Sequence, residues 1–411
     1  MAESDKTRES RERSGSQGDL GRKFLELVEK FGEIELDNVT MTVDELILML
    51  QPSVTRFVRP VARPEIAPPI AKLVDRLVEV EFAPPVETYP AQVVEVQLGA
   101  TRSEGGTRRK VVKIGGAKTL PFYGFEGINP NGPAFAMDVF DMPLHLPKAV
   151  RQHFDDVIDD PAAWAKKCVK DFSADVISLN LISTDPGLKN TSPAEAANTV
   201  ENVLQAIDVP VVIGGSGNKQ KDPLVLEKAA EATHGERCLL NSVSTDTDYK
   251  TVVRAALKHN HSVVAFTPMD INNQKKLNRL LLGEGLPKTQ LVIDPTTGAL
   301  GYGIEYSLSL LERIRLGALM GDTELQMPVL SAASNAWGAR EAWMKIDDWG
   351  PKEFRGPLWE TVTGLTMLMS GADLFMVSHP ATVRVLKQIA ENLYGIGETK
   401  HSIENWITAL G

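Results

Sequence analysis

AFAMDVFD at residues 134–141 and DVISLNLIS at residues 175–183 are short apolar runs, and a stretch with helical spacing separates them. The same alternation continues through six more runs, at 209–215 (VPVVIGG), 238–243 (CLLNSV), 262–269 (SVVAFTPM), 290–294 (QLVID), 327–334 (MPVLSAAS) and 373–378 (DLFMVS). Strands that alternate with helices are typical of parallel βαβ units. Eight such units match a (β/α)8 barrel, the TIM-barrel architecture of the α/β class, in number and length. An open doubly wound sheet is the alternative that the pattern leaves.

Three helices between these runs carry start signals. Asp160-Pro161 and Asp222-Pro223 each predict an N-cap carboxylate followed by a first-turn proline. Ser192 precedes Pro193, and Glu195 three residues after Ser192 completes a capping box. These signals support helices in the crossovers between the strands.

The N-terminal part differs in composition from the barrel. Residues 1–20 are polar and charged and are predicted to form a disordered tail. Residues 21–90 are predicted to be an extension, with helices at 23–31 and, after the capping box of Thr42 and Glu45, at 43–50; eight prolines follow between 51 and 90. Residues 91–411 form the predicted barrel domain. It opens with a hairpin of 92–98 and 110–114, which by analogy with other barrels plugs the N-terminal end.

Composition excludes several classes of function. The chain has 411 residues and a net charge of −10, which argues against nucleic acid or anionic membranes as the main partner. It has no apolar signal core and no run long enough to span a membrane, so we expect a cytoplasmic protein. Its two cysteines, Cys168 and Cys238, are too few for an iron–sulfur cubane, which needs four thiolates.

In a barrel of this kind, function is located at the C-terminal ends of the strands. Those ends, beginning with Asp138 of the first strand, are rich in amides and hydroxyls and poor in strong acids and bases. Such a lining suits a polar ligand with many arms, although single polar residues there are also ordinary loop caps. The candidate ligand-binding residues are Asn180, Asn241, Ser242, Thr267, Asp294, Thr296, Thr297, Ser331, Asn335 and Ser378. Trp337 and Trp343 follow the seventh strand and are predicted to pack on a ligand, on a partner or in the core.

A glycine-rich run and a histidine are weaker indications of function. The glycine-rich run 214–217 is either an anion site or, the favoured interpretation, a tight turn. His379 alone among the histidines follows a predicted strand directly, where either a ligand contact or a capping role is expected. No metal site and no general base are predicted.

Several of these segments together resemble a known family. They are 135–143 (FAMDVFDMP), 177–187 (ISLNLISTDPG), 211–223 (VVIGGSGNKQKDP), 239–245 (LLNSVST) and 291–303 (LVIDPTTGALGYG). In this order they resemble the small subunit of the corrinoid iron–sulfur protein, whose archaeal equivalent is the delta subunit of the acetyl-CoA decarbonylase/synthase complex. The resemblance covers about 90–395.

The resemblance implies a barrel that is not catalytic alone and pairs with a large (gamma) subunit. That partner carries a [4Fe–4S] cluster and a corrinoid (cobalamin), and the mouth of the small-subunit barrel covers the corrinoid. A methyltransferase then transfers a methyl group from a methyltetrahydropterin to the cobalt, which carries it to acetyl-CoA synthase. The chain lacks the D-x-H-x-x-G motif by which many corrinoid domains bind cobalt, so the partner is expected to hold most of the cofactor.

Two alternatives remain. The barrel is also similar to pterin-dependent methyltransferases, in which an Asn and an Asp at strand ends contact the pterin; Asn241 and Asp294 are the candidates here. The third possibility is a scaffold that docks subunits and never contacts a cofactor.

Overall fold

The computed structural model describes residues 83–127 and 129–394. Eight parallel strands are hydrogen-bonded in the order β8-β7-β6-β5-β4-β3-β10-β9. The N–H of Ile293 donates to the carbonyl of Pro328 at 2.9 Å, and a bridge between Ile293 and Val329 joins the two ends of the sheet. The strands are β3 Ala134–Phe140, β4 Val176–Asn180, β5 Val211–Gly214, β6 Leu239–Val243, β7 Ser262–Phe266, β8 Leu291–Asp294, β9 Leu330–Ala332 and β10 Leu374–Val377. The predicted (β/α)8 barrel is confirmed, and the open sheet is wrong.

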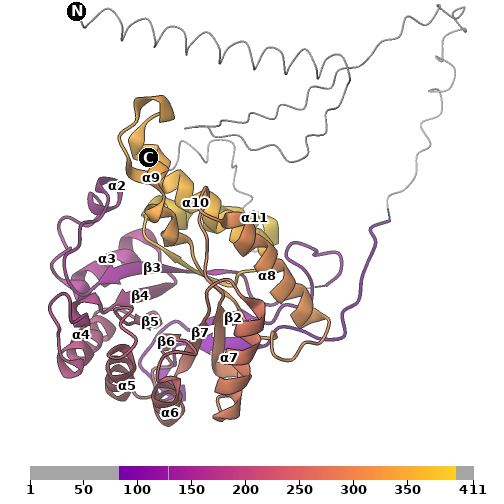
Figure 1. Cartoon of the computed structure of the whole chain (residues 1–411), viewed down its shortest axis with the longest axis horizontal. Helices are drawn as coiled ribbons and strands as arrows, with labels where there is room; N and C mark the ends of the chain where they lie inside the picture. The colour runs from indigo at the N-terminus through magenta and orange to yellow at the C-terminus, as the bar shows by residue number, and fades with distance from the viewer. Residues whose placement is uncertain (1–82, 128, 395–411) are drawn as a thin grey trace, which may run out of the picture. The chain divides into compact units, whose positions relative to one another are not determined.

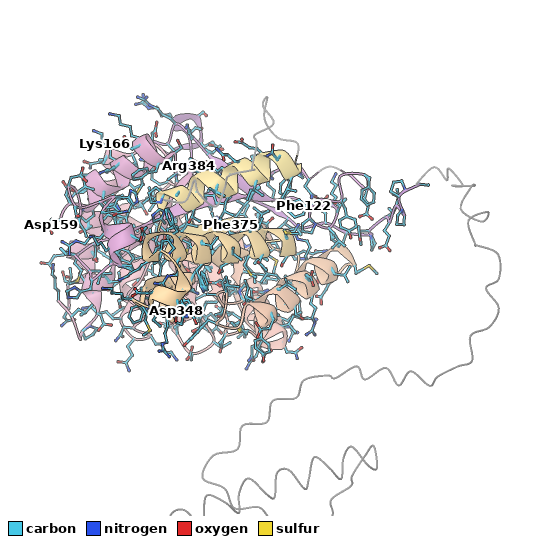
Figure 2. The ribbon with its side chains drawn as sticks, turned by 90° about the horizontal axis from the view of Figure 1, so that it is seen from above. Phe122, Asp159, Lys166, Asp348, Phe375 and Arg384 are labelled. Atoms are coloured by element: carbon cyan, nitrogen blue, oxygen red, sulfur yellow. The ribbon has the colours of Figure 1, made fainter. Side chains whose placement is uncertain are left out.

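Helices surround the strands on the outside of the barrel (Figure 1). The helices of the described residues are α2 Lys148–Arg151, α3 Pro161–Phe172, α4 Pro193–Ala206, α5 Asp222–Ala232, α6 Tyr249–His259, α7 Ile271–Gly283, α8 Ile304–Leu319, α9 Arg340–Trp343, α10 Lys352–Ser370 and α11 Pro380–Tyr394. In Figure 2, Phe375 of β10 lies in the interior, whereas Lys166 of α3 lies at the periphery. Among the described residues, none of the helices is long and apolar enough to cross a membrane.

The interior of the barrel is closed below by a hairpin. Strands β1 Glu95–Leu98 and β2 Val112–Gly115 pair antiparallel. Their buried side chains Val96, Leu98 and Ile114 pack in one cluster with the side chains that point into the barrel. Those inward side chains are Ala134, Ala136, Val176, Val212, Leu239, Val264, Val292, Leu330, Leu374 and Met376. The predicted plugging hairpin is therefore confirmed, and a second, larger cluster fills the space between strands and helices.

Helices begin at all three predicted starts, and two of the three predicted N-caps are confirmed. The Asp160 carboxylate accepts the backbone N–H groups of Ala162 and Ala163 at 2.9 and 3.1 Å. Ser192 and Glu195 form the expected capping box. Both contacts satisfy N–H groups that the first turn of a helix leaves without a partner.

The helix after the glycine-rich run begins as predicted, but the N-cap role of Asp222 is wrong. Asp222 is the first residue of α5, and its carboxylate turns back to the run 214–217. It accepts the N–H and hydroxyl of Ser216, both at 2.9 Å, and the N–H of Gly217 at 2.8 Å. The chain's own carboxylate thus occupies the backbone donors that an external anion would need, as the tight-turn interpretation expects.

The predicted tail at 1–20 lies outside the described residues. So does the extension up to residue 82, including both of its predicted helices. Residues 83–90, the described end of the proline-rich segment, form neither helix nor strand.

Candidate functional site

Strand alternation decides which polar residues face the interior at the C-terminal end, here called the mouth. Side chains two residues apart lie on the same face of a strand. The apolar side chains that point into the barrel, given above, therefore show which of the following residues also point inward. Counting upward from Ala136, Val176, Leu239, Val292 and Met376 in steps of two reaches the inward polar set, which is Asp138, Ser178, Asn180, Asn241, Asp294 and Ser378. Four of these six are candidate ligand-binding residues from the sequence, and the other two are Asp138 and Ser178, which lie opposite each other on β3 and β4.

Asp138 gathers side chains from two neighbouring strands. The Ser378 hydroxyl donates to its Oδ2 at 3.0 Å, and the Asn180 amide lies 3.4 Å from its Oδ1. Burial raises the pKa of Asp138, and hydrogen bonds from Ser378 and Ser334 oppose that rise. The mouth therefore holds a carboxyl group that is shielded from water and hydrogen-bonded by neighbouring serine and asparagine side chains.

Asp294 occupies the other side of the mouth with fewer partners. Its Oδ1 accepts the N–H of Thr296 at 2.9 Å, and only 7% of the residue is exposed. Burial raises its pKa to about 7, so at neutral pH the carboxyl group can both donate and accept. Such a group suits a ligand that presents amide-type donors and acceptors.

Asn241 is half-buried and nearly free. Within the part of the chain that the structure describes, the only hydrogen bond of its amide Nδ2 is the weak one to the Met376 sulfur at 3.9 Å. The register of β6 against β7 shifts between Leu240 and Val243, so alternation does not place Ser242, which is half-buried beside Asn241. An amide with open hydrogen-bonding positions can donate to a ligand and accept from it.

The remaining candidates form a separate network behind the loops of β7, β8 and β9. Thr267 donates to Gln274 of α7 at 2.6 Å, so it points outward from the barrel. Thr296 donates to the carbonyl of Thr267 at 2.8 Å, and Thr297 lies 2.9 Å from the Ser331 hydroxyl. The Asn335 amide donates to the Thr297 carbonyl at 2.9 Å. These side chains stabilise the loops around the mouth, and the hydroxyls of Thr267, Thr296, Thr297 and Ser331 already have partners in the chain.

Glu360 of α10 is a buried acid that the sequence analysis missed. Its carboxylate accepts the N–H groups of Ser378 and His379 at 2.6 and 3.0 Å, and burial raises its pKa to about 7. It therefore fixes the backbone that carries Ser378 into the mouth. One signal was present, because Glu360 is the only charged residue between Gly356 and Ala372.

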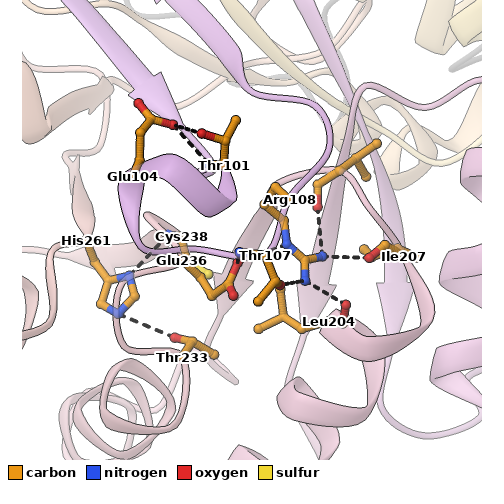
Figure 3. A network of polar contacts seen from close by, with 12 residues as sticks. Thr101, Glu104, Thr107, Arg108, Leu204, Ile207, Thr233, Glu236, Cys238 and His261 are labelled. Carbon is orange, nitrogen blue, oxygen red and sulfur yellow. Dashed lines mark hydrogen bonds and ion pairs between the residues drawn. The ribbon is translucent and has the colours of Figure 1, made fainter.

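The histidines have structural contacts. His379 is buried, its Nδ1 accepts the N–H of Ala381 at 3.1 Å, and burial lowers its pKa to about 3, so it caps α11 as a neutral ring. His261 lies below the barrel, where its Nδ1 accepts the N–H of Cys238 at 3.1 Å (Figure 3). Among the described residues, no group of three or more His, Cys, Asp or Glu could hold a metal ion.

A groove borders the mouth, between the loop after β3 and the segment after β9. Its volume is about 810 Å³, within the range of small-molecule sites. Trp337 and Trp343 form its apolar walls, and His145, Lys148 and Lys352 lie along it. Trp343 is 45% exposed, whereas Trp337 packs in a stacked orientation 6.2 Å from the His379 ring. The groove adds an aromatic surface beside the polar mouth.

Comparison with known proteins identifies related chains. A family model described as CO dehydrogenase/acetyl-CoA synthase delta subunit matches residues 95–347. The acetyl-CoA decarbonylase/synthase complex subunit delta of Methanocaldococcus jannaschii is 49% identical over 393 residues, covering 94% of this chain and 96% of that protein. The corresponding subunit of Methanothermobacter thermautotrophicus is 50% identical over 401 residues, covering 94% and 97%.

Among solved structures, Yersinia pestis dihydropteroate synthase matches with a TM-score of 0.47 and 16% identity, over 65% of this chain and 95% of that one.

Proposed function

The chain belongs to the family of CO dehydrogenase/acetyl-CoA synthase delta subunits, and from this membership we propose that its barrel mouth covers a corrinoid held by a partner subunit. In this proposal the partner is a large (gamma) subunit that also carries a [4Fe–4S] cluster. The pair passes a methyl group between a methyltetrahydropterin and acetyl-CoA synthase. The observation that carries the proposal is a polar mouth with an open amide, Asn241, beside a groove walled by tryptophans.

The residues present fit such a ligand. A corrinoid is a flat macrocycle edged with amide arms, and inward Asn180, Asn241, Asp294 and Ser378 offer amide, carboxyl and hydroxyl groups at several angles. The exposed face of Trp343 suits an apolar rim. When bound, the corrinoid supplies a cobalt that accepts and releases the methyl group.

The role of this chain is to bind, orient and exclude water. Asp138 and Asp294 lie at low exposure, so a ligand that closes the mouth exchanges water for fixed dipoles. The cluster belongs on the partner, because Cys168 and Cys238 are only two thiols and both are buried. No residue of the chain is assigned as a general base.

The test uses the complex assembled with its partner subunit. Asn241→Ala combined with Ser378→Ala should lower the corrinoid retained per complex by about tenfold, because two hydrogen bonds in a dry site are lost. Absorbance of the purified complex measures corrinoid, and gel filtration measures assembly. The matched control is Asn198→Ala with Ser309→Ala, which removes an amide and a hydroxyl from exposed positions on α4 and α8. Full corrinoid retention in an intact double variant would contradict cofactor contact and leave a scaffold role.

A pterin site is a second candidate, favoured by the inward pair Asn241 and Asp294 with free polar atoms. A carboxyl group and an amide that both point into the barrel offer the donors and acceptors that the edge of a pterin ring requires. In that case the isolated chain should bind methyltetrahydropterin and methylate free cobalamin, and Asp294→Ala should abolish the binding. A chain that binds the pterin only together with its partner contradicts this candidate.

A further inference from the structure

A second groove lies at the opposite end of the barrel from the mouth. Its volume is about 760 Å³, and it lies beside the hairpin that closes the barrel below. Apolar side chains of α3 and α4, Val169 and Leu204, form part of its lining. Six cationic residues line it: Arg108 is buried and paired with Glu236, and the other five, which are exposed, are Arg102, Arg109, Lys110, Lys166 and Lys170. We call it the basic groove.

The backbone on one side of the basic groove is firmly held (Figure 3). The guanidinium of Arg108 donates to Glu236 at 2.9 Å and to the carbonyls of Ile207 and Leu204 at 2.7 and 2.8 Å. The next two N–H groups, of Arg109 and Lys110, donate to the Asp208 carbonyl. These bonds attach the hairpin loop to the end of α4, so the positions of the cations that follow Arg108 are defined.

The charge of the groove is unbalanced. Within the described residues, none of the five exposed cations takes part in an ion pair, and Asp208 is the one carboxylate in the lining. The chain as a whole carries a net charge of −10, so the overall charge of the protein does not account for a local excess of cations. Lys170 lies in the last turn of α3, where the helix dipole stabilises a cation. The other four exposed cations are not in such a position. A concave surface lined by one sign of charge concentrates the field and attracts the opposite charge.

We propose that the basic groove binds an acidic polypeptide segment of a neighbouring subunit. The cations are exposed, long side chains spread over a hairpin loop and a helix, which suits a row of carboxylates along an extended surface. A small phosphate ligand would be expected to use fixed convergent donors. Here the Arg108 guanidinium and the two backbone N–H groups that follow are already bonded within the chain. The groove is on the end opposite the mouth, so the chain can hold two partners at once.

The first test is made on the isolated full-length chain. A fluorescein-labelled oligoglutamate peptide is the probe, and fluorescence anisotropy measures its affinity. Lys166→Glu with Lys170→Glu should weaken binding by about tenfold or more, because repulsion replaces attraction. The control, Lys118→Glu with Lys276→Glu, makes the same change in net charge at exposed lysines outside the groove and should change the affinity less than about twofold.

The second test is made on the intact complex. A carbodiimide that joins amines directly to carboxylates should link Lys166 or Lys170 to an Asp or Glu of another subunit, and peptide mass spectrometry identifies the pair. In a complex that carries the groove variant, the neighbouring subunit should be lost while corrinoid content per remaining complex is unchanged, which separates this result from failure at the mouth. Equal loss of affinity in the control variant, pyrophosphate binding as tight as oligoglutamate, or the absence of cross-links from both groove lysines would overturn the proposal.

Discussion

The burial of Asp294 makes the free energy of unfolding depend on pH. Burial raises its pKa to about 7 from the ordinary 3.8. Between these values the folded state holds a proton that the unfolded state has lost, so the free energy of unfolding falls as pH rises through this window. Asp294→Asn keeps the acceptor for Thr296 and cannot ionise. The free energy of unfolding of the variant, relative to that of the native chain, should therefore be roughly 1–3 kcal/mol higher at pH 8 than at pH 5.

Urea unfolding at the two pH values measures this gain. The control is Asp159→Asn, which makes the same substitution at an exposed position and should change the free energy of unfolding by less than about 0.5 kcal/mol. If the Asp294→Asn variant and the native chain lose stability equally between the two pH values, the carboxyl group is not a buried acid of this kind.

Arg108 tests the anchoring of the hairpin. Arg108→Met leaves the Glu236 carboxylate buried without its cation, and two strong carbonyl contacts are lost. Removal of one partner of a buried pair costs about 3–5 kcal/mol. Adding Glu236→Met should recover about 1–2 kcal/mol, because the unpaired charge disappears.

Chemical unfolding measures both Arg108 variants. Arg151→Met, which breaks the exposed Arg151–Asp155 pair, is the control and should cost less than about 1 kcal/mol. Equal costs for the buried and the exposed arginine would show that the hairpin is not fastened by this contact.

Residue identity in the mouth could be predicted in part. Asn180, Asn241, Asp294 and Ser378 follow from strand ends, and strand alternation places them inward. The same alternation places Thr267 and Ser331 on the outward face, where they bond to other loops and helices. Glu360 could not be assigned to the mouth, because its contact with Ser378 depends on how α10 crosses the end of β10.

At the scale of elements, the turn from β5 to α5 depends on a glycine. A Cβ on Gly215 would lie 2.4–2.8 Å from the carboxyl atoms of Asp222. Gly215→Ala therefore displaces the carboxylate that bonds Ser216 and Gly217, and should cost about 1–3 kcal/mol. Gly283→Ala is the control, because nothing lies within 4 Å of its added Cβ at the end of α7. Thermal unfolding compares them, and a cost for Gly215→Ala no greater than for Gly283→Ala would contradict the close approach.

Helix starts illustrate what local sequence can and cannot predict. Asp160 and Ser192 act within one turn of their own positions, so their N-cap roles are visible in the sequence. Asp222 has the same Asp-Pro signature but bonds the preceding glycine-rich turn, because that turn brings its N–H groups within reach. Two competing local partners were available, and only the three-dimensional path of the turn decides between them.

At the scale of the whole molecule, the repeat of strand and helix sufficed to predict the barrel, because each unit uses short-range patterns. The contacts that shape the two ends could not be predicted in this way. Ser378 meets Asp138 across 240 residues and Arg108 meets Glu236 across 128, so neither pair leaves a periodic signal. Alternation predicts which way a side chain points, but the partner that it finds depends on barrel closure.

The strands of the barrel differ in how many residues they pair with their neighbours, and this difference predicts where the barrel opens first. β4 pairs with its neighbours through five and four residue pairs, whereas β9 is three residues long and meets β8 through one bridge. Local opening follows the elements with the fewest ladder contacts. Hydrogen exchange measured by mass spectrometry should therefore be faster in peptides covering 327–332 than in peptides covering 176–180. Exchange in β9 as slow as in β4 would contradict a weak seam, and would mean that the buried side chains of Met327 and Val329 hold β9 as firmly as a full ladder does.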